Sequence, residues 1–198
     1  NGLYLLYGDR ELDRVSELYE KAVELEARDA MEKLDIVLYP EAGLREVCTP
    51  VPEMNDEIDK LIDDMFYTMY DAPGIGLAAP QIAVQERIIV VDVSETKDQP
   101  IALINPEIIR SAGQISWEEG CLSIPGIYAT VKRPSDILVR GMNRDGKIIE
   151  LEADELLAVC IQHEIDHLNG TLFIDHLSGL KRTRALQKFR KSLEEKEH

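Results

Sequence analysis

The sequence predicts an α+β fold in which mainly antiparallel sheets pack around a central buried helix, with a further helix at the C-terminus. Apolar residues recur at helical spacing in residues 55–70, 154–168 and 178–195, whereas the strand-like runs gather between residues 87 and 151. Two of those runs flank residues 143–146, whose sequence Asn-Arg-Asp-Gly is typical of the turn in an antiparallel hairpin. Helices and strands are therefore segregated along the chain, as in the α+β class.

The composition is that of a single domain that folds in water, with 198 residues of which 44% are hydrophobic and 30% charged. The formal net charge of -16 argues against broad wrapping of nucleic acid, because most of the surface would repel phosphate. No apolar run approaches the ~20 residues that span a bilayer, so we expect no membrane contact and a cytoplasmic location. An organellar location stays open, because a transit peptide is removed from the mature chain.

The three cysteines, Cys48, Cys121 and Cys160, are odd in number and widely spaced. Such a set does not form a disulfide framework and favours a reducing compartment. At least one thiol is therefore available for a chemical role.

The first 30 residues are expected to lie outside the functional domain. Residues 9–28 carry apolar side chains at helical spacing and predict an amphipathic helix. This segment ends directly before Met31, which resembles a natural protein start. We therefore divide the chain into an amphipathic helical leader, residues 1–30, and a functional domain, residues 31–198.

The elements of that domain follow from local patterns. Residues 55–70 predict a helix with one apolar stripe, which Asn55 or Asp56 can cap. Residues 73–76 read Pro-Gly-Ile-Gly, which forbids helix and predicts a loop whose backbone can approach a ligand closely. Residues 178–195 predict a helix with an apolar inner face. Strands are predicted at residues 87–93, 101–104, 108–117, 137–142 and 147–151.

The helix at residues 154–168 is apolar on nearly every face and should be buried on all sides. His163 and His167 interrupt it one turn apart on one face, and Glu164 follows the first of them. Burying these groups without partners would cost several kcal/mol. The His-Glu-x-x-His pattern predicts a metal held by two imidazoles, with the glutamate moving a proton. The alternative is a pair of hydrogen-bonded core histidines.

A third ligand decides between these interpretations. The extended protease pattern has a third histidine, but Phe173 stands at that position here, and no glutamate lies between His167 and Glu194. His176 is the nearest downstream substitute. Upstream, Cys121 follows a glycine in an extended segment, and its thiolate suits Zn or Fe while leaving a fourth position open for water. We therefore favour Cys121 as the third ligand.

Three segments together resemble the peptide deformylase family: residues 74–81 (Gly-Ile-Gly-Leu-Ala-Ala-Pro-Gln), 119–123 (Glu-Gly-Cys-Leu-Ser) and 162–167 (Gln-His-Glu-Ile-Asp-His). All three motifs occur in family order, and the resemblance covers roughly residues 31–190. It implies a catalytic domain that removes the N-formyl group from the N-terminal formylmethionine of nascent peptides. It further implies Fe(II) as the native metal, with Zn(II), Ni(II) or Co(II) able to replace it.

The resemblance also assigns roles within the site. A metal-bound hydroxide attacks the formyl carbon, with Glu164 as general acid and base. Gln81 and the backbone N–H of Leu122 face the developing oxyanion. Two further groups bind substrate, with Ile75, Gly76 and Gly120 along the peptide backbone and Leu156, Val159 and Cys160 around the methionine side chain. For the last three, ordinary core packing is an alternative that can coexist with this use.

Two features depart from the family pattern. Tyr128 stands where many bacterial relatives carry an arginine that contacts the substrate backbone, and the leader has no counterpart in the minimal family domain. The resemblance also implies contact with the ribosome through the basic residues 181–191, for which a solvated helix face is the alternative. The competing functions are a metallopeptidase and a catalytically silent protein that binds nascent chains or metal.

Overall fold

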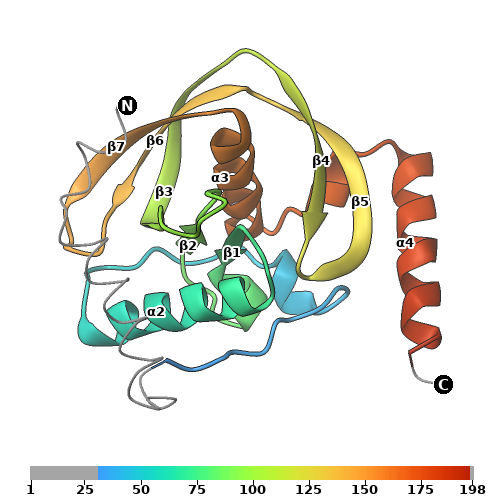
Figure 1. Ribbon diagram of the computed structural model, residues 1–198, viewed down its shortest axis with the longest axis horizontal. Coiled ribbons are helices and arrows are strands. Elements are labelled where there is room, and N and C mark those ends of the chain that lie inside the picture. The colour runs from blue at the N-terminus through green and yellow to red at the C-terminus, as the bar shows by residue number, and fades with distance from the viewer. Residues whose placement is uncertain (1–30, 197–198) are drawn as a thin grey trace.

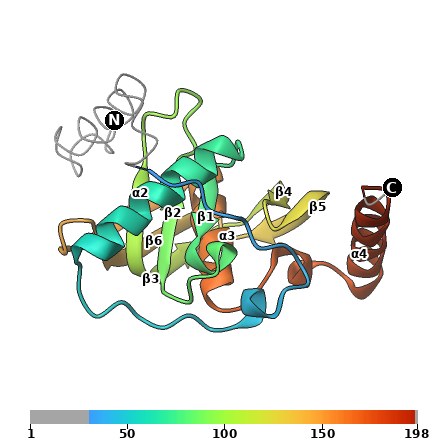
Figure 2. The same ribbon diagram turned by 90° about the horizontal axis from the view of Figure 1, so that it is seen from below.

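The computed structural model describes residues 31–196, so the predicted leader lies outside the described residues. A five-stranded sheet runs in the order β1-β2-β3-β6-β7, and every neighbouring pair is antiparallel. Figures 1 and 2 show this sheet between α2 and α3. Its strands are β1 (Gly76–Ala78), β2 (Ile88–Val91), β3 (Ile101–Ala112), β6 (Asp136–Met142) and β7 (Ile148–Asp154). The predicted α+β class is confirmed.

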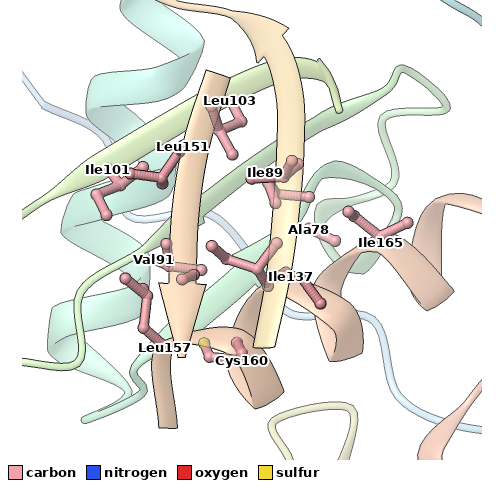
Figure 3. Packing of buried hydrophobic residues seen from close by; sticks show 14 of the residues in the cluster. Ala78, Ile89, Val91, Ile101, Leu103, Ile137, Leu151, Leu157, Cys160 and Ile165 are labelled. Atoms are coloured by element: carbon pink, nitrogen blue, oxygen red, sulfur yellow. The ribbon is translucent and has the colours of Figure 1, made fainter. Parts of the chain in front are cut away.

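Both faces of this sheet are buried at β1 and β2, because helices cover them there. Successive side chains of a strand point to opposite faces, so Ile89 and Val91 pack with α3 (Glu155–Leu168) while Ile88 and Val90 pack with α2 (Asp56–Asp71). Figure 3 shows the first of these clusters, where side chains of the strands meet the helix. The central helix is therefore buried by the sheet, as its apolar sequence predicted.

A second sheet pairs β4 (Ile115–Cys121) with β5 (Ile124–Arg133) and has its own apolar cluster. Phe173 of the short helix η4 (Phe173–His176) and Phe189 of α4 (Gly179–Glu194) are almost fully buried in that cluster. Helix α4 stands at the edge of the molecule beside β5 (Figure 1). The small sheet thus connects Cys121, at the end of β4, with the C-terminal helix.

Capping residues and backbone contacts set the ends of the helices. Asn55 caps α2, because its Oδ1 accepts a hydrogen bond from the N–H of Ile58 at 2.9 Å. After α3, Gly170 has φ +72°, and a Cβ there would lie 2.4 Å from the carbonyl oxygen of Arg45. Only glycine allows this close approach of two backbones. No helix among residues 31–196 is long and apolar enough to cross a membrane.

Several predicted strand boundaries were wrong. Residues 108–117 do not form one strand, because Gly113 has φ +66° and separates β3 from β4, which lie in different sheets. Residues 101–104 and 108–112 instead belong to one strand, β3, with register shifts near Asn105. Strands β1 and β5 were not predicted. The hairpin at residues 143–146 is confirmed, and Asn143 N–H donates to the oxygen of Lys147 at 2.8 Å across it.

Candidate active site

The three predicted metal ligands converge from two elements. Cys121 ends β4, while His163 and His167 lie one turn apart on α3. Their ligand atoms all lie within 4.8 Å of one another, and Sγ of Cys121 is 3.4 Å from Nε2 of His167. One sulfur and two imidazole nitrogens at this spacing match a site for a tetrahedral or five-coordinate transition metal. His176, the downstream substitute, does not belong to this group.

A buried hydrogen-bond chain orients His163. Its Nδ1 donates to Oε1 of Glu119 at 2.8 Å, which leaves Nε2 free for a metal. Arg133 donates to both oxygens of Glu119, at 2.6 and 2.9 Å, and to Oδ2 of Asp166 at 2.9 Å. His176 reaches the same Asp166 oxygen at 2.8 Å from the surface. These hydrogen bonds therefore connect His163, a predicted ligand, to the protein surface through four further side chains.

Sequence reasoning gave no role to Glu119 or Arg133. A signal for Glu119 was present, because it precedes Cys121 by two residues and so shares a face of the same strand. Arg133 had no such signal, since its approach to Glu119 depends on the pairing of β4 with β5.

Two polar atoms in the site lack partners among the described residues: Nδ1 of His167 and Oε2 of Glu164, both fully buried. Glu164 is only 4% exposed. Burial raises the pKa of Glu164 to about 7, although the charge of His163 opposes this shift. A buried carboxylate beside unpaired donors and acceptors is costly. A metal-bound water would provide the partner that Oε2 of Glu164 lacks among the described residues, and Nε2 of His167 faces Sγ of Cys121, so the residues present fit such an ion.

A cavity of about 420 Å³ opens onto these groups. Its lining contains every predicted site residue except His167, which is almost fully buried: Ile75, Gly76, Gln81, Gly120, Cys121, Leu122, Leu156, Val159, Cys160, His163 and Glu164. Trp117 and Tyr128 add aromatic surface at its edge and are partly exposed. The cavity is thus an apolar recess with its polar groups gathered around the predicted ligands.

Two glycines allow close packing in this cavity. A Cβ on Gly76 would lie 2.5 Å from Oε1 of Glu164 and 2.8 Å from Sγ of Cys160, so the backbone of β1 lies against the predicted general base. A Cβ on Gly120 would lie 2.7 Å from Cε1 of Tyr128. The Tyr128 ring therefore covers Gly120 on the paired strand, where the two residues are directly opposite.

Fold and site together define a hydrolase centre with a Cys-His-His donor set and a buried glutamate beside an apolar recess. The polypeptide deformylase family matches residues 33–183. A peptide deformylase of Hydrogenovibrio crunogenus is 82% identical over 165 residues, covering 83% of this chain and 98% of that relative. One of Cellvibrio japonicus is 54% identical, covering 81% and 96%. The crystal structure of a peptide deformylase from Legionella pneumophila superposes with a TM-score of 0.81 at 46% identity, covering 84% and 99%.

The chain belongs to the polypeptide deformylase family. It is therefore an enzyme that removes the formyl group from N-terminal formylmethionine, a step of protein biosynthesis.

Proposed function

We propose that deformylation by this chain depends on one divalent metal ion held by Cys121, His163 and His167. The observation that carries this proposal is the convergence of their three ligand atoms within 4.8 Å, beside the buried Oε2 of Glu164 that lacks a partner among the described residues. Fe(II) is the proposed native ion, and Zn(II), Ni(II) or Co(II) are proposed to replace it, because thiolate and imidazole ligands suit all four. Bound there, the ion would supply Lewis acidity that lowers the pKa of a water molecule towards ~7.

Glu164 is the proposed general base and acid. It accepts a proton from the attacking water and passes it to the amine that leaves. Burial raises the pKa of Glu164 above its usual value, which favours uptake of a proton near neutral pH. Its place beside Gly76 on the cavity wall puts its oxygens next to the backbone where the substrate would bind.

The remaining lining residues orient the substrate. Nε2 of Gln81 and the backbone N–H of Leu122 are the proposed donors to the oxyanion. Leu156, Val159 and Cys160 are proposed to enclose the methionine side chain, since they form the apolar part of the recess on α3. Gly76 of β1, Ile75 directly before it and Gly120 of β4 line the cavity and are proposed to contact the backbone of the peptide.

The location and the wider partners are also proposals. A cytoplasmic enzyme would meet formylated nascent chains as they leave the ribosome. The basic face of α4 supports a transient contact with ribosomal RNA, because it concentrates positive charge on a protein of net charge -16.

The mechanism is tested with a formyl-methionyl peptide and with variants that separate metal binding from proton transfer. Glu164→Gln should keep its metal and lose at least ~100-fold in kcat, because glutamine fits the space but cannot accept a proton. Cys121→Ala should lose the metal itself, since two ligands make a weak site. Metal analysis of anaerobically purified protein identifies the resident ion. Cleavage of internal peptide bonds with an intact formyl group would instead support a metallopeptidase.

A further inference from the structure

The side-chain amide of Gln81 is held at both of its ends. Oε1 accepts a hydrogen bond from the N–H of Ala78 at 3.0 Å. Nε2 donates to Oγ of Ser123 at 3.1 Å and lies 3.6 Å from Sγ of Cys121. A backbone N–H can only donate, so the oxygen of Gln81 must face Ala78 and its NH₂ group must face Ser123 and the ligand sulfur. The orientation of the amide is therefore unambiguous.

The backbones that carry Gln81 and Ser123 are also tied together. The N–H of Val37 donates to the carbonyl oxygen of Gln81 at 2.7 Å, and the N–H of Tyr39 donates to that of Ser123 at 2.9 Å. One short segment, residues 37–39, thus bridges the two. Both side chains are almost completely buried, with Gln81 1% and Ser123 0% exposed. Their separation is set by backbone contacts rather than by the side chains alone.

We propose that Ser123 is a positioning residue whose hydroxyl aims Gln81 at the oxyanion of the substrate. An amide nitrogen carries two hydrogens, and Ser123 takes one of them. The other is donated to Sγ of Cys121 at 3.6 Å, on the cavity side, and this longer hydrogen bond is the one that an oxyanion of the substrate would replace. This inference rests on the proposed role of Gln81 as an oxyanion donor. It adds that the Ser123 hydroxyl fixes the direction of the Gln81 amide before the substrate binds.

The physical basis is preorganisation. The terminal torsion of a glutamine is broad, so an amide without an anchor samples many directions. An oxyanion donor is effective when it is already aimed at the position where charge develops. Losing the Ser123 hydroxyl should therefore lower kcat about 10-fold and leave KM nearly unchanged. This loss should be smaller than that of Gln81→Ala, for which ~100-fold or more is expected of a missing donor.

A double-mutant cycle tests the proposal. Ser123→Ala, Gln81→Ala and the double variant are assayed with a formyl-methionyl peptide, and Ser123→Thr, which retains a hydroxyl, should restore activity. Ser192→Ala serves as the matched control, because its hydroxyl bonds a backbone carbonyl in α4, away from the cavity. We expect the effect of Ser123→Ala to vanish when Gln81 is already alanine. If Ser123 had only a structural role, Ser123→Ala would lower activity by the same factor whether residue 81 is glutamine or alanine.

A second measurement needs neither activity nor a variant. Zn(II) is d¹⁰, so NMR of the zinc-loaded wild-type protein can observe the Gln81 side-chain amide. One amide proton should exchange slowly with solvent and show a nuclear Overhauser effect to the β protons of Ser123. Two rapidly exchanging protons without this contact would overturn the role of Ser123. So would an equal loss of activity from Ser123→Ala whether residue 81 is glutamine or alanine. Neither result would affect the proposed role of Gln81. Full activity of Gln81→Ala would overturn the oxyanion role as well.

Discussion

Nδ1 of His163 donates to a carboxylate, Glu119, that is itself clamped by Arg133 through both of its oxygens. All three side chains are buried. Burial alone would raise the pKa of Glu119, but the hydrogen bonds from His163 and Arg133 outweigh it and lower that pKa. The carboxylate therefore stays ionised at neutral pH. An ionised partner fixes the tautomer of a ligand histidine and makes its other nitrogen a better donor to metal.

Removing the charge of Glu119 should weaken metal binding. We expect Glu119→Gln to lower the affinity for Zn(II) or Co(II) about 10- to 100-fold, as is typical when the partner of a ligand histidine is changed. Competition with a chromogenic chelator measures this affinity. Glu107→Gln, an exposed carboxylate on β3, is the control and should bind metal as the parent does. Equal affinity in both variants would show that Glu119 only packs beside His163.

Gly76 should tolerate no side chain. A Cβ there would meet Oε1 of Glu164 at 2.5 Å and Sγ of Cys160 at 2.8 Å, so Gly76→Ala must displace the proposed general base. We expect kcat for a formyl-methionyl peptide to fall at least ~100-fold, because proton transfer depends on position. In Gly179→Ala the new methyl group meets nothing within 4 Å, and this control should retain parent activity. Parent activity in Gly76→Ala would show that Glu164 can move without loss.

Much of the site was readable from the sequence because its chemistry lies in short local patterns. The spacing of His163 and His167 places both imidazoles on one helix face whatever the rest of the fold does. The proposed third ligand needed long-range information, since Cys121 lies on another element. Only the need for a third donor, together with the family motifs, selected Cys121.

What could not be predicted depends on strand pairing. Arg133 and Glu119 are 14 residues apart, and they meet only because β4 and β5 pair in the register that puts both on one face. That register follows from the packing of the small sheet, which no local pattern specifies. In the same way, a glycine within apolar sequence can sit in a strand or end one, and φ +66° at Gly113 was visible only in the structure.

The predicted leader should be dispensable. The catalytic domain is proposed to begin near Met31, and a relative that is 82% identical is matched over 98% of its own length by only 83% of this chain. Just after this point the chain is anchored, because the N–H of Glu32 donates to Oδ1 of Asp64 at 2.7 Å. A protein truncated to Met31 should keep its kcat/KM and its thermal midpoint. Aggregation or lost activity would instead indicate that the apolar stripe of residues 12–25 packs on the domain.

Substitutions in α4 should weaken binding to ribosomes without changing catalysis. The helix packs on the domain through Phe189, while its basic side chains are exposed. These side chains are Lys181, Arg182, Arg184, Lys188, Arg190 and Lys191. A solvated helix face is the alternative, but the helix dipole favours only Lys191, the one basic residue in the last turn of α4. In the other interpretation these basic side chains bind the phosphates of RNA, which the acidic residues elsewhere on the surface would repel.

Salt dependence distinguishes the two interpretations. Contacts of a few Lys and Arg side chains with phosphate weaken steeply as salt rises, because binding releases counterions. We therefore expect the parent to co-sediment with ribosomes at low salt and to be released as salt increases. One variant replaces Lys181, Arg182, Arg184 and Lys188 with Gln. The matched control replaces four exposed bases elsewhere, Lys33, Arg110, Arg140 and Lys147, with Gln.

The α4 variant should stay in the supernatant at low salt, whereas the control should pellet with the parent. Both variants should hydrolyse small formyl peptides at the parent rate, because none of the eight residues lines the cavity. Equal loss of pelleting in both variants would mean that overall charge, rather than α4, governs association. Pelleting of all three proteins at every salt concentration, or of none even at low salt, would exclude docking through α4 and leave its bases as a solvated helix face.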